Sequence, residues 1–358
     1  MRVREIGLSS AGPDDIERWE DLAARAAEPN PFFEPGFARA AAAHLDGPEP
    51  TLLAVEDGGR WLACLPVQAT RVARLLPAWR TWCHLYCFLG IPLLDTDAAV
   101  PAGRALLDHA ITRAPGRQLV LELLSRDGVV GQALDEAAAD LGLVVTVGDF
   151  HERALVMRRA AGGYVDHVRS HHRREIARLG RRLEAQLGAL VMSDQAASPD
   201  AVERFIALES SGWKGRALTS LGDSPAHAQL FREVCRSFAA QGRLELLELS
   251  AGGRAVAMKC NLNAADGGFC FKIAYDEQLG RFSPGVQLEW ENVTHFHEQQ
   301  RVKWQDSCAD PDNEMINRLW PDRRAISTTL VARRGARGTV ARQAMRGARA
   351  IRAVRDSR

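Results

Sequence analysis

Two stretches of this chain share one pattern: Leu53-Ala-Val-Glu-Asp-Gly58-Gly59-Arg60-Trp-Leu-Ala63 and Leu247-Glu-Leu-Ser-Ala-Gly252-Gly253-Arg254-Ala-Val-Ala257. In each stretch, two apolar strands flank a Gly-Gly pair. Paired glycines accept the positive φ angles of tight hairpin turns, so each stretch predicts a β-hairpin. The recurrence decides the fold, because it indicates one α/β module used twice. The alternative is a chance recurrence of common hairpin chemistry.

Helix signals follow both hairpins. Pro101-Ala-Gly103 opens one helical pattern of apolar residues, and Pro284-Gly285 opens another. Strand-like apolar runs alternate with helical patterns along the chain, at Leu119–Leu124, Leu143–Val147, Ala154–Met157, Leu244–Leu249, Ala255–Leu262, Phe269–Ala274 and Ser327–Ala332. The alternation predicts an α/β protein of mixed sheets covered by helices. We expect one domain at 1–160, a second at 161–332 and an Arg-rich tail at 333–358.

Length and composition are those of a globular protein. The 358 residues, 46% of them hydrophobic, are enough for two domains with separate cores. The longest apolar runs fall far short of the roughly 18 residues that span a bilayer. The N-terminus continues into Pro13-Asp-Asp15 rather than into an apolar run, so we expect a cytoplasmic protein with no signal peptide and no transmembrane segment.

Cysteine and histidine spacing does not indicate a metal site. The seven cysteines are scattered and odd in number, which argues against a disulfide framework. Cys83-His-Leu-Tyr-Cys87 is not followed by a second Cys/His pair at ligand spacing. We therefore expect no metal, and core packing for most of these thiols.

Basic residues are distributed unevenly. Of the 46, only four are lysines, at Lys214, Lys259, Lys272 and Lys303. Their confinement to one ninety-residue stretch suggests a functional need for a compact ammonium, with chance as the alternative. The segment Tyr164–Leu187 predicts an amphipathic helix with a basic face, which is either simply solvated or binds anions. The tail, with nine arginines and one acid, either solubilises the protein or contacts RNA or a membrane surface.

The densest group of polar residues lies between Phe269 and Leu288. A strand ends at Ala274, a polar loop follows, and Pro284-Gly285 begins a helix. Backbone N–H groups at a helix start are unpaired and lie at the positive end of the helix dipole, so a phosphate can bind there. Arg281 and Ser283 would add a guanidinium and a hydroxyl.

These residues resemble a known family. Lys272-Ile-Ala-Tyr275-Asp276-Glu277, then Ser283-Pro-Gly285, with Glu209-Ser-Ser-Gly-Trp213-Lys214-Gly upstream, resembles the GNAT-fold acyltransferases of the CelD/BcsL type, which are similar in turn to FemAB aminoacyl transferases. The resemblance covers roughly 164–332, and it reaches the N-terminal half only through the repeat. It implies two tandem GNAT-like domains, of which the N-terminal one is degenerate.

The resemblance also implies a cofactor site. In GNAT proteins, a loop of the form Arg/Gln-x-x-Gly-x-Gly/Ala wraps the pyrophosphate of acyl-CoA. The counterpart here would be Arg281-Phe-Ser283-Pro-Gly285-Val286, with one glycine instead of two. The matching N-terminal segment, Ala98-Ala-Val-Pro-Ala-Gly103, has no basic residue. We therefore expect acetyl-CoA or another acyl-CoA to bind the second domain, through Arg281, Ser283, Gly285 and Val286.

The implied activity is transfer of an acetyl or other acyl group from acyl-CoA to an amine of a small-molecule, sugar or envelope precursor. Asp276 or Glu277 would act as base, Tyr275 would protonate the leaving thiolate, and Lys272 would polarise a carbonyl or bind a carboxylate. The structural alternatives are an ion pair between Lys272 and Asp276 and a packing role for Tyr275.

A second group is expected to bind substrate. Glu209, Trp213 and Lys214 lie at the end of a helix predicted over Pro199–Ser211, where nearby glycines allow a sharp change of direction. Packing of Trp213 is the alternative. Two other functions remain open: a FemAB-like transferase that uses aminoacyl-tRNA held by the basic helix and the tail, and a non-catalytic GNAT-fold binding protein.

Overall fold

The computed structural model describes residues 1–72, 75–159 and 163–335. The chain divides into two compact units. The first unit comprises Met1–Ala42, Asp46–Glu152 and residues 324–335. The second unit comprises Arg153–Arg323 together with Ala43–Leu45. Residues 336–358 of the predicted tail lie outside the described residues.

One order of elements occurs twice along the chain. The first repeat consists of β1 (Arg2–Gly7), α1 (Pro13–Ala24), α2 (Pro35–His44), β2 (Thr51–Asp57), β3 (Arg60–Val72), β4 (Leu76–Thr81), α3 (Ala99–Arg113), β6 (Gln118–Ser125), α4 (Val129–Asp140) and β7 (Val144–Met157). The second consists of β8 (Leu190–Asp194), α6 (Ala201–Ser211), α8 (Pro225–Ala240), β9 (Leu244–Ala251), β10 (Arg254–Ala264), β11 (Gly267–Tyr275), α9 (Pro284–Gln299), β12 (Trp304–Asp306), α10 (Glu314–Leu319) and β13 (Asp322–Ala332). The predicted tandem α/β fold is therefore confirmed.

Other elements have no counterpart in the other repeat. Helix α5 (Ser170–Leu187) lies between the two repeats in the sequence, and the short α7 (Trp213–Arg216) follows α6. The short strand β5 (Leu93–Leu94) pairs with β3. A 3₁₀ helix, η6 (Glu277–Phe282), connects β11 to α9.

The two predicted hairpins have the same turn. Gly58 and Gly59 have φ angles of +56° and +82°, and Gly252 and Gly253 have +57° and +80°. Two successive residues with positive φ define the turn that matches the twist of a two-stranded ribbon, and glycine adopts it without strain. The repeated Gly-Gly pair therefore encodes the same local geometry in β2–β3 and in β9–β10.

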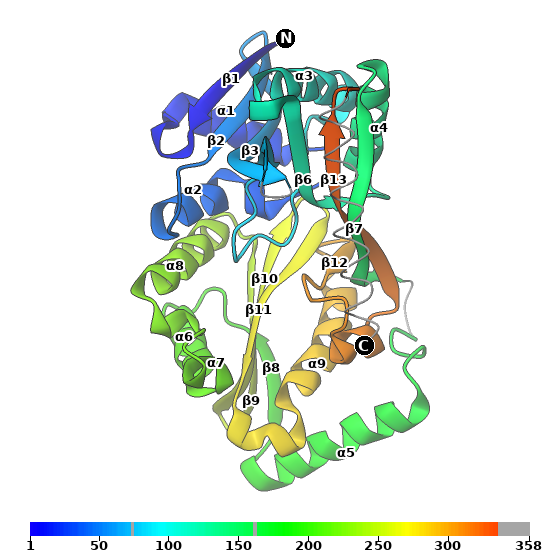
Figure 1. Cartoon of the computed structure of the whole chain (residues 1–358). Coiled ribbons are helices and arrows are strands. Elements are labelled where there is room, and N and C mark those ends of the chain that lie inside the picture. Colours follow the sequence, from blue (N-terminus) through cyan, green and yellow to red (C-terminus); the bar gives the residue numbers. More distant parts are fainter. Residues whose placement is uncertain (73–74, 160–162, 336–358) are drawn as a thin grey trace. The chain divides into compact units, whose positions relative to one another are not determined.

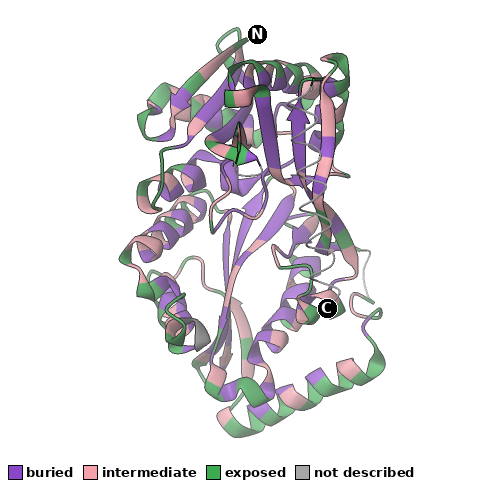
Figure 2. Ribbon diagram, in the orientation of Figure 1, coloured by how far each residue is buried: buried purple, intermediate pink, exposed green. Residues whose placement is uncertain are grey.

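The sheet of the first unit has the strand order β1-β2-β3-β4-β6-β13-β7. β1 and β2, β2 and β3, β3 and β4, and β6 and β13 pair antiparallel, whereas β4 and β6 are parallel. Helix α3 packs on β2, β3 and β6, and α1 packs on β3. Most apolar residues of these strands are buried (Figure 2), and they form the core of this unit.

The sheet of the second unit runs from the end of β7 through β12, β11, β10 and β9 to β8. Helix α9 packs against β9, β10 and β11, and α6 packs against β10 and β11. Figure 1 shows α6 and α8 on one side of these strands and α9 on the other. Helix α5 contacts α9 and η6 and is exposed along much of its length. This unit is therefore a sheet between two layers of helices.

Several predicted boundaries differ from the structure. The runs Leu143–Val147 and Ala154–Met157 belong to the one strand β7, because polar residues between them interrupt the apolar pattern without breaking the strand. The helix predicted from Pro199 begins at Ala201, and the basic helix begins at Ser170. Among the described residues, no helix is both long and apolar enough to cross a bilayer.

Candidate active site

The site predicted from sequence lies where two parallel strands part. β11 and β12 pair only through Gly267–Phe269 against Trp304–Asp306. β12 ends at Asp306, whereas β11 continues to Tyr275. The last six residues of β11 thus run beyond the end of their parallel neighbour, towards η6 and α9.

A β-bulge interrupts β11 just after the strands part. Cys260 of β10 pairs with Lys272, but the next residue, Asn261, pairs with Cys270, so that Phe271 is an extra residue. A bulge changes the direction of side chains locally, and bulges occur often beside active sites. Here Phe271 stacks on Phe231 of α8, with ring centroids 6.0 Å apart. Lys272 also reaches the helix layer that contains α6.

Lys272 forms an ion pair with Glu209 at the end of α6. The Lys272 Nζ lies 3.3 Å from Glu209 Oε1, and the two side chains are 13% and 1% exposed. The other carboxylate oxygen, Oε2, accepts a hydrogen bond of 2.8 Å from the Leu221 backbone N–H. The structure therefore brings together one predicted catalytic residue and one predicted substrate-binding residue, and it leaves a small part of the ammonium accessible.

The other two predicted substrate-binding residues are placed only by their backbone. Trp213 and Lys214 begin α7, directly after α6, but their side chains lie outside the described part of the structure. Gly215 is required in this helix, because a Cβ there would lie 1.9 Å from the Ser210 carbonyl oxygen. At the end of α7, Arg216 donates to Glu277 of η6 at 2.5 Å.

Asp276 caps η6. Its carboxylate accepts a 2.9 Å hydrogen bond from the Gln278 backbone N–H and forms an ion pair with Arg254 of β10. The side chain is buried. The ion pair that we considered between Lys272 and Asp276 is wrong, because each residue has a different partner of opposite charge on a different element.

Tyr275 lies at the junction between β11 and α9. Its ring packs against Gly285, where an added Cβ would lie 3.4 Å from Tyr275 Cδ1. The residue is 36% exposed. The structure therefore places its ring against the first turn of α9.

The predicted cofactor loop forms the start of α9. Ser283 has a left-handed backbone (φ +52°), and its carbonyl accepts hydrogen bonds from Val286 (2.9 Å) and Gln287 (3.1 Å). Its hydroxyl does not cap the helix. Gly285 is the second residue of α9. Pro284 has no N–H, and the N–H groups of Val286 and Gln287 already donate to the Ser283 carbonyl, which leaves the Gly285 N–H of this first turn for a ligand. This arrangement leaves a hydroxyl and the positive end of a helix dipole at one point.

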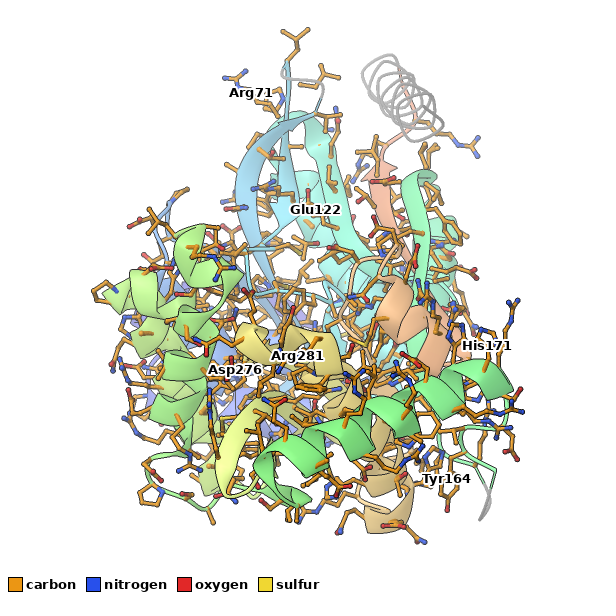
Figure 3. All side chains as sticks on the ribbon, turned by 90° about the horizontal axis from the view of Figure 1, so that it is seen from below. Arg71, Glu122, Tyr164, His171, Asp276 and Arg281 are labelled. Atoms are coloured by element: carbon orange, nitrogen blue, oxygen red, sulfur yellow. The ribbon has the colours of Figure 1, made fainter. Side chains whose placement is uncertain are left out.

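Arg281 lies at the end of η6, beside this helix start. Its guanidinium donates to Gln186 of α5 at 2.9 Å and lies 4.8 Å from the centre of the Phe282 ring. In Figure 3, Asp276 and Arg281 are labelled near each other, and α5 runs below both labels towards His171. Arg281 is exposed, so its charge is available to an anion.

The corresponding place in the first repeat is arranged differently. β4 and β6 pair in parallel only through Trp79 and Arg80, and β4 ends at Thr81. The chain then returns to β6, because the Gly90 N–H donates to the Leu123 carbonyl at 3.0 Å. A Cβ on Gly90 would lie 2.0 Å from the Glu122 carbonyl oxygen, so this approach requires glycine. The first repeat therefore covers the edge of β6 with its own chain.

Sequence analysis missed a buried polar cluster behind β11. Glu289 of α9 accepts hydrogen bonds from Lys259, Asn292 and Trp320. Burial alone would lower the pKa of Lys259, but its interactions with Cys270 and Glu289 hold that pKa above its ordinary value. The one available signal was the rarity of lysine in this chain, since Lys259 is one of only four.

Comparisons with known proteins identify the second unit's fold. Residues 170–313 match the acetyltransferase (GNAT) domain family. No curated protein sequence is detectably similar to the chain.

Solved structures resemble nearly the whole chain. FemX has 9% identity and a TM-score of 0.60, with 92% of this chain and 97% of FemX covered. The C-terminal domain (DUF2156) of a protein assigned as a lysylphosphatidylglycerol synthetase from Agrobacterium fabrum has 15% identity and a TM-score of 0.57, with 93% and 95% covered. L-PGS from Bacillus licheniformis has 12% identity and a TM-score of 0.50, with 94% and 97% covered. At these identities the likeness is one of fold.

Proposed function

We propose that the second unit is an acyl-CoA-dependent N-acyltransferase. It would move an acetyl or longer acyl group to an amine of a small-molecule, sugar or envelope precursor. One observation carries the proposal, and it lies within the residues that match the GNAT domain. After β11 parts from β12, a bulge in β11 directs Lys272 to Glu209. The same strand then leads to the start of α9. The reaction would take place in the cytoplasm.

The start of α9 supports the cofactor assignment. Arg281, Ser283 and Gly285 would hold the phosphates of acyl-CoA through a guanidinium, a hydroxyl and a backbone N–H, and Val286 would line the site from the same helical turn. Bound acyl-CoA would supply an activated thioester. The residues present fit such a group, because the exposed Arg281, the Ser283 hydroxyl and the positive end of the helix dipole lie together at the start of α9.

Each predicted catalytic residue has a role that its surroundings allow. Lys272 is held by its ion pair with Glu209 and would polarise the carbonyl or hold a carboxylate of the acceptor. Asp276 would take the amine proton, directly or through water, and Tyr275 would supply a proton to the departing thiolate. A C–N bond forms and a C–S bond breaks, so one proton leaves the amine and one reaches the sulfur.

Acceptor binding is assigned to the end of α6 and to α7. Glu209 is fixed by Lys272 and by the Leu221 N–H, and Trp213 and Lys214 follow within one turn of chain. We propose these three residues as the substrate-binding group.

The donor site is assigned to the second repeat alone. In the first repeat, Gly90 donates to β6, and the segment from Ala98 to Gly103 has no basic residue. That copy would therefore be structural.

The basic face of α5 keeps a second function open. Arg174, Arg181 and Arg182 are exposed on this helix. An aminoacyl-tRNA donor would use such a surface for its phosphates, and the affinity would then fall steeply with salt. A contact of the Arg-rich tail with RNA or a membrane surface also remains a prediction.

The test is thiol release from acetyl-CoA and longer acyl-CoAs in the presence of a panel of amines. We expect amine-dependent release by the wild type and a large loss in Lys272→Ala and Asp276→Asn. The matched control is Arg178→Ala, which removes an exposed arginine of α5 paired with Glu175. Full turnover in both site variants would overturn the site assignment. Transfer from charged tRNA but not from acyl-CoA would favour the second function.

A further inference from the structure

The carboxylate of Glu289 lies at the centre of a buried network. It accepts hydrogen bonds from Lys259 Nζ at 2.5 Å, Asn292 Nδ2 at 3.0 Å and Trp320 Nε1 at 3.0 Å. The side chains of Lys259 and Glu289 are 3% and 2% exposed. A charge pair so far from water is retained only with good geometry and additional hydrogen bonds, and this carboxylate has both.

The network links three elements around the point where the strands part. Asn292 of α9 donates to Gln305 Oε1 of β12 at 3.1 Å. Asn261 of β10 donates to Asn292 Oδ1 at 3.3 Å. We call these six residues the Glu289 network: Lys259, Asn261, Glu289, Asn292, Gln305 and Trp320. It joins α9 to both β10 and β12.

The network holds β10 on both sides of the bulge. Lys259 and Asn261 flank Cys260, whose partner in β11 is Lys272. Alternate residues of a strand point to opposite faces, so Lys259 and Asn261 reach α9 while Cys260 faces the other helix layer. Gln305 pairs with Gly268, one residue before β11 and β12 part. The network thus fixes the strands next to the bulge from the face opposite Lys272.

The first repeat provides an internal control. When Gly58-Gly59 is aligned with Gly252-Gly253, Leu65 takes the place of Lys259. When Pro101 is aligned with Pro284, Leu106 takes the place of Glu289. Both leucines are completely buried. The pairing of β3 with β4 ends at Val67 and Thr81, and Val67 is the counterpart of Asn261 in this alignment. The repeat without the ion pair is therefore also the repeat whose strand ends at the position where β11 continues through its bulge.

Stability does not explain the network. An apolar pair of similar volume is often as stable as a buried ion pair, or more stable, and the first repeat packs two leucines at these positions. We propose that Lys259 and Glu289 are positioning residues, which hold the β11 bulge so that Lys272 meets the reacting groups. This inference rests on the proposed function of the second unit.

The test gives the second repeat the two leucines that the first repeat has at these positions, with the double variant Lys259→Leu/Glu289→Leu. We expect a folded protein whose thermal midpoint falls by less than that of Lys259→Met, because no buried charge is left without its partner, although the Trp320 N–H loses its acceptor. We expect kcat to fall by on the order of 100-fold, because a displacement of about 1 Å can cost that much. The Kd for acyl-CoA should change by less than about threefold, because the contacts that hold the start of α9 remain. These contacts are the packing of Tyr275 on Gly285 and the ion pair of Asp276 with Arg254. The matched control, Lys303→Ala/Asp266→Ala, removes an exposed ion pair of the same unit and should leave all three quantities unchanged.

A second readout does not depend on activity. Amide hydrogen exchange of residues 270–275 in the unliganded protein should be faster in the double leucine variant than in the wild type and in the control. If the double leucine variant does not fold, Glu289→Gln replaces it in the test. This variant should also lower kcat and speed amide exchange of residues 270–275. Unchanged kcat and unchanged exchange in a folded variant would overturn the inference. A wild type that neither binds nor turns over any acyl-CoA would instead overturn the proposed function.

Discussion

The two repeats differ at the place where their parallel strands part, β11 and β12 in one and β4 and β6 in the other. In the second repeat, β11 passes through a bulge and continues to Tyr275 after its parallel partner β12 has ended. In the first repeat, β4 ends at Thr81, and Gly90 returns the chain to the edge of β6. The fold thus tolerates either an extended strand or a covering segment at this junction.

The difference extends into the core. Behind the junction, the second repeat has the ion pair of Lys259 and Glu289, whereas the first has Leu65 and Leu106. Hydrophobic packing is sufficient for the fold, as the first repeat demonstrates. The polar residues of the second repeat therefore require an explanation in chemistry rather than in stability, and the proposed acyl transfer supplies one.

Lys272→Met should have the largest effect of the variants that compare the two repeats. Loss of an electrostatic group that acts on the reacting carbonyl should reduce kcat/KM by about 10²–10³-fold. Arg80→Met, on β4 of the first repeat, should leave kcat/KM within about twofold. Because Glu209 loses its cation in this variant, the free energy of unfolding of Lys272→Met is measured alongside kcat/KM, which separates stability from catalysis. Equal losses in the Lys272 and Arg80 variants would contradict the assignment of activity to one repeat.

Removal of one partner of the buried pair should destabilise the second unit strongly. Lys259→Met leaves the Glu289 carboxylate uncompensated, which costs about 3–5 kcal/mol in comparable buried pairs. Urea unfolding, followed by a probe in each unit, measures this loss. The double leucine variant should lose much less, and a single variant as stable as the double would show that Glu289 does not need its cation.

Acid should destabilise the first unit through His84. Burial lowers the pKa of His84 to about 4. The ring therefore stays neutral when folded but gains a proton near pH 6.5 when unfolded. Its contribution is fully present above pH 6.5 and is lost as the pH falls towards 4, by up to about 3 kcal/mol.

This prediction is checked by urea unfolding at pH 7 and pH 4.5. His84→Asn keeps an acceptor for the Tyr86 N–H and should show a smaller pH dependence than the wild type. His171→Asn changes an exposed histidine of the second unit and should behave as the wild type. If the free energy of unfolding falls equally from pH 7 to pH 4.5 in all three proteins, His84 is not the cause of the acid destabilisation.

Gly90→Ala should have the smallest effect. Its Cβ would collide with the Glu122 carbonyl oxygen, and a clash in a packed region costs about 1–3 kcal/mol. Thermal unfolding should reveal the loss, while kcat at a temperature well below the transition stays unchanged. A fall in kcat without loss of stability would mean that the junction of the first repeat takes part in the reaction.

The sequence predicted the features that depend on local chemistry. Each Gly-Gly pair specified a turn with positive φ, and Pro284-Gly285 specified a helix start, because both depend only on residues close in sequence. The recurrence of the Gly-Gly hairpin then predicted the tandem fold, which is confirmed. A phosphate site at the start of α9 was predicted from local chemistry, and its assignment to acyl-CoA came from the family resemblance.

Contacts between distant residues could not be read from the sequence. Glu209 and Lys272 are 63 positions apart, and only the bulge at Phe271 turns the lysine towards α6. An acidic residue within an apolar helical pattern, such as Glu289, gives no indication that its partner is Lys259 on another element. The wrong pairing of Lys272 with Asp276 arose from proximity in the chain.

Calorimetric titration with acetyl-CoA is the most direct test of the claim that only the second repeat binds the donor. We expect one site per chain, lost in Arg281→Ala and retained in Arg80→Ala. At one hundred times its Kd, the ligand should also stabilise the protein by roughly 2.7 kcal/mol. Two sites per chain, or binding that survives Arg281→Ala but not Arg80→Ala, would contradict the account.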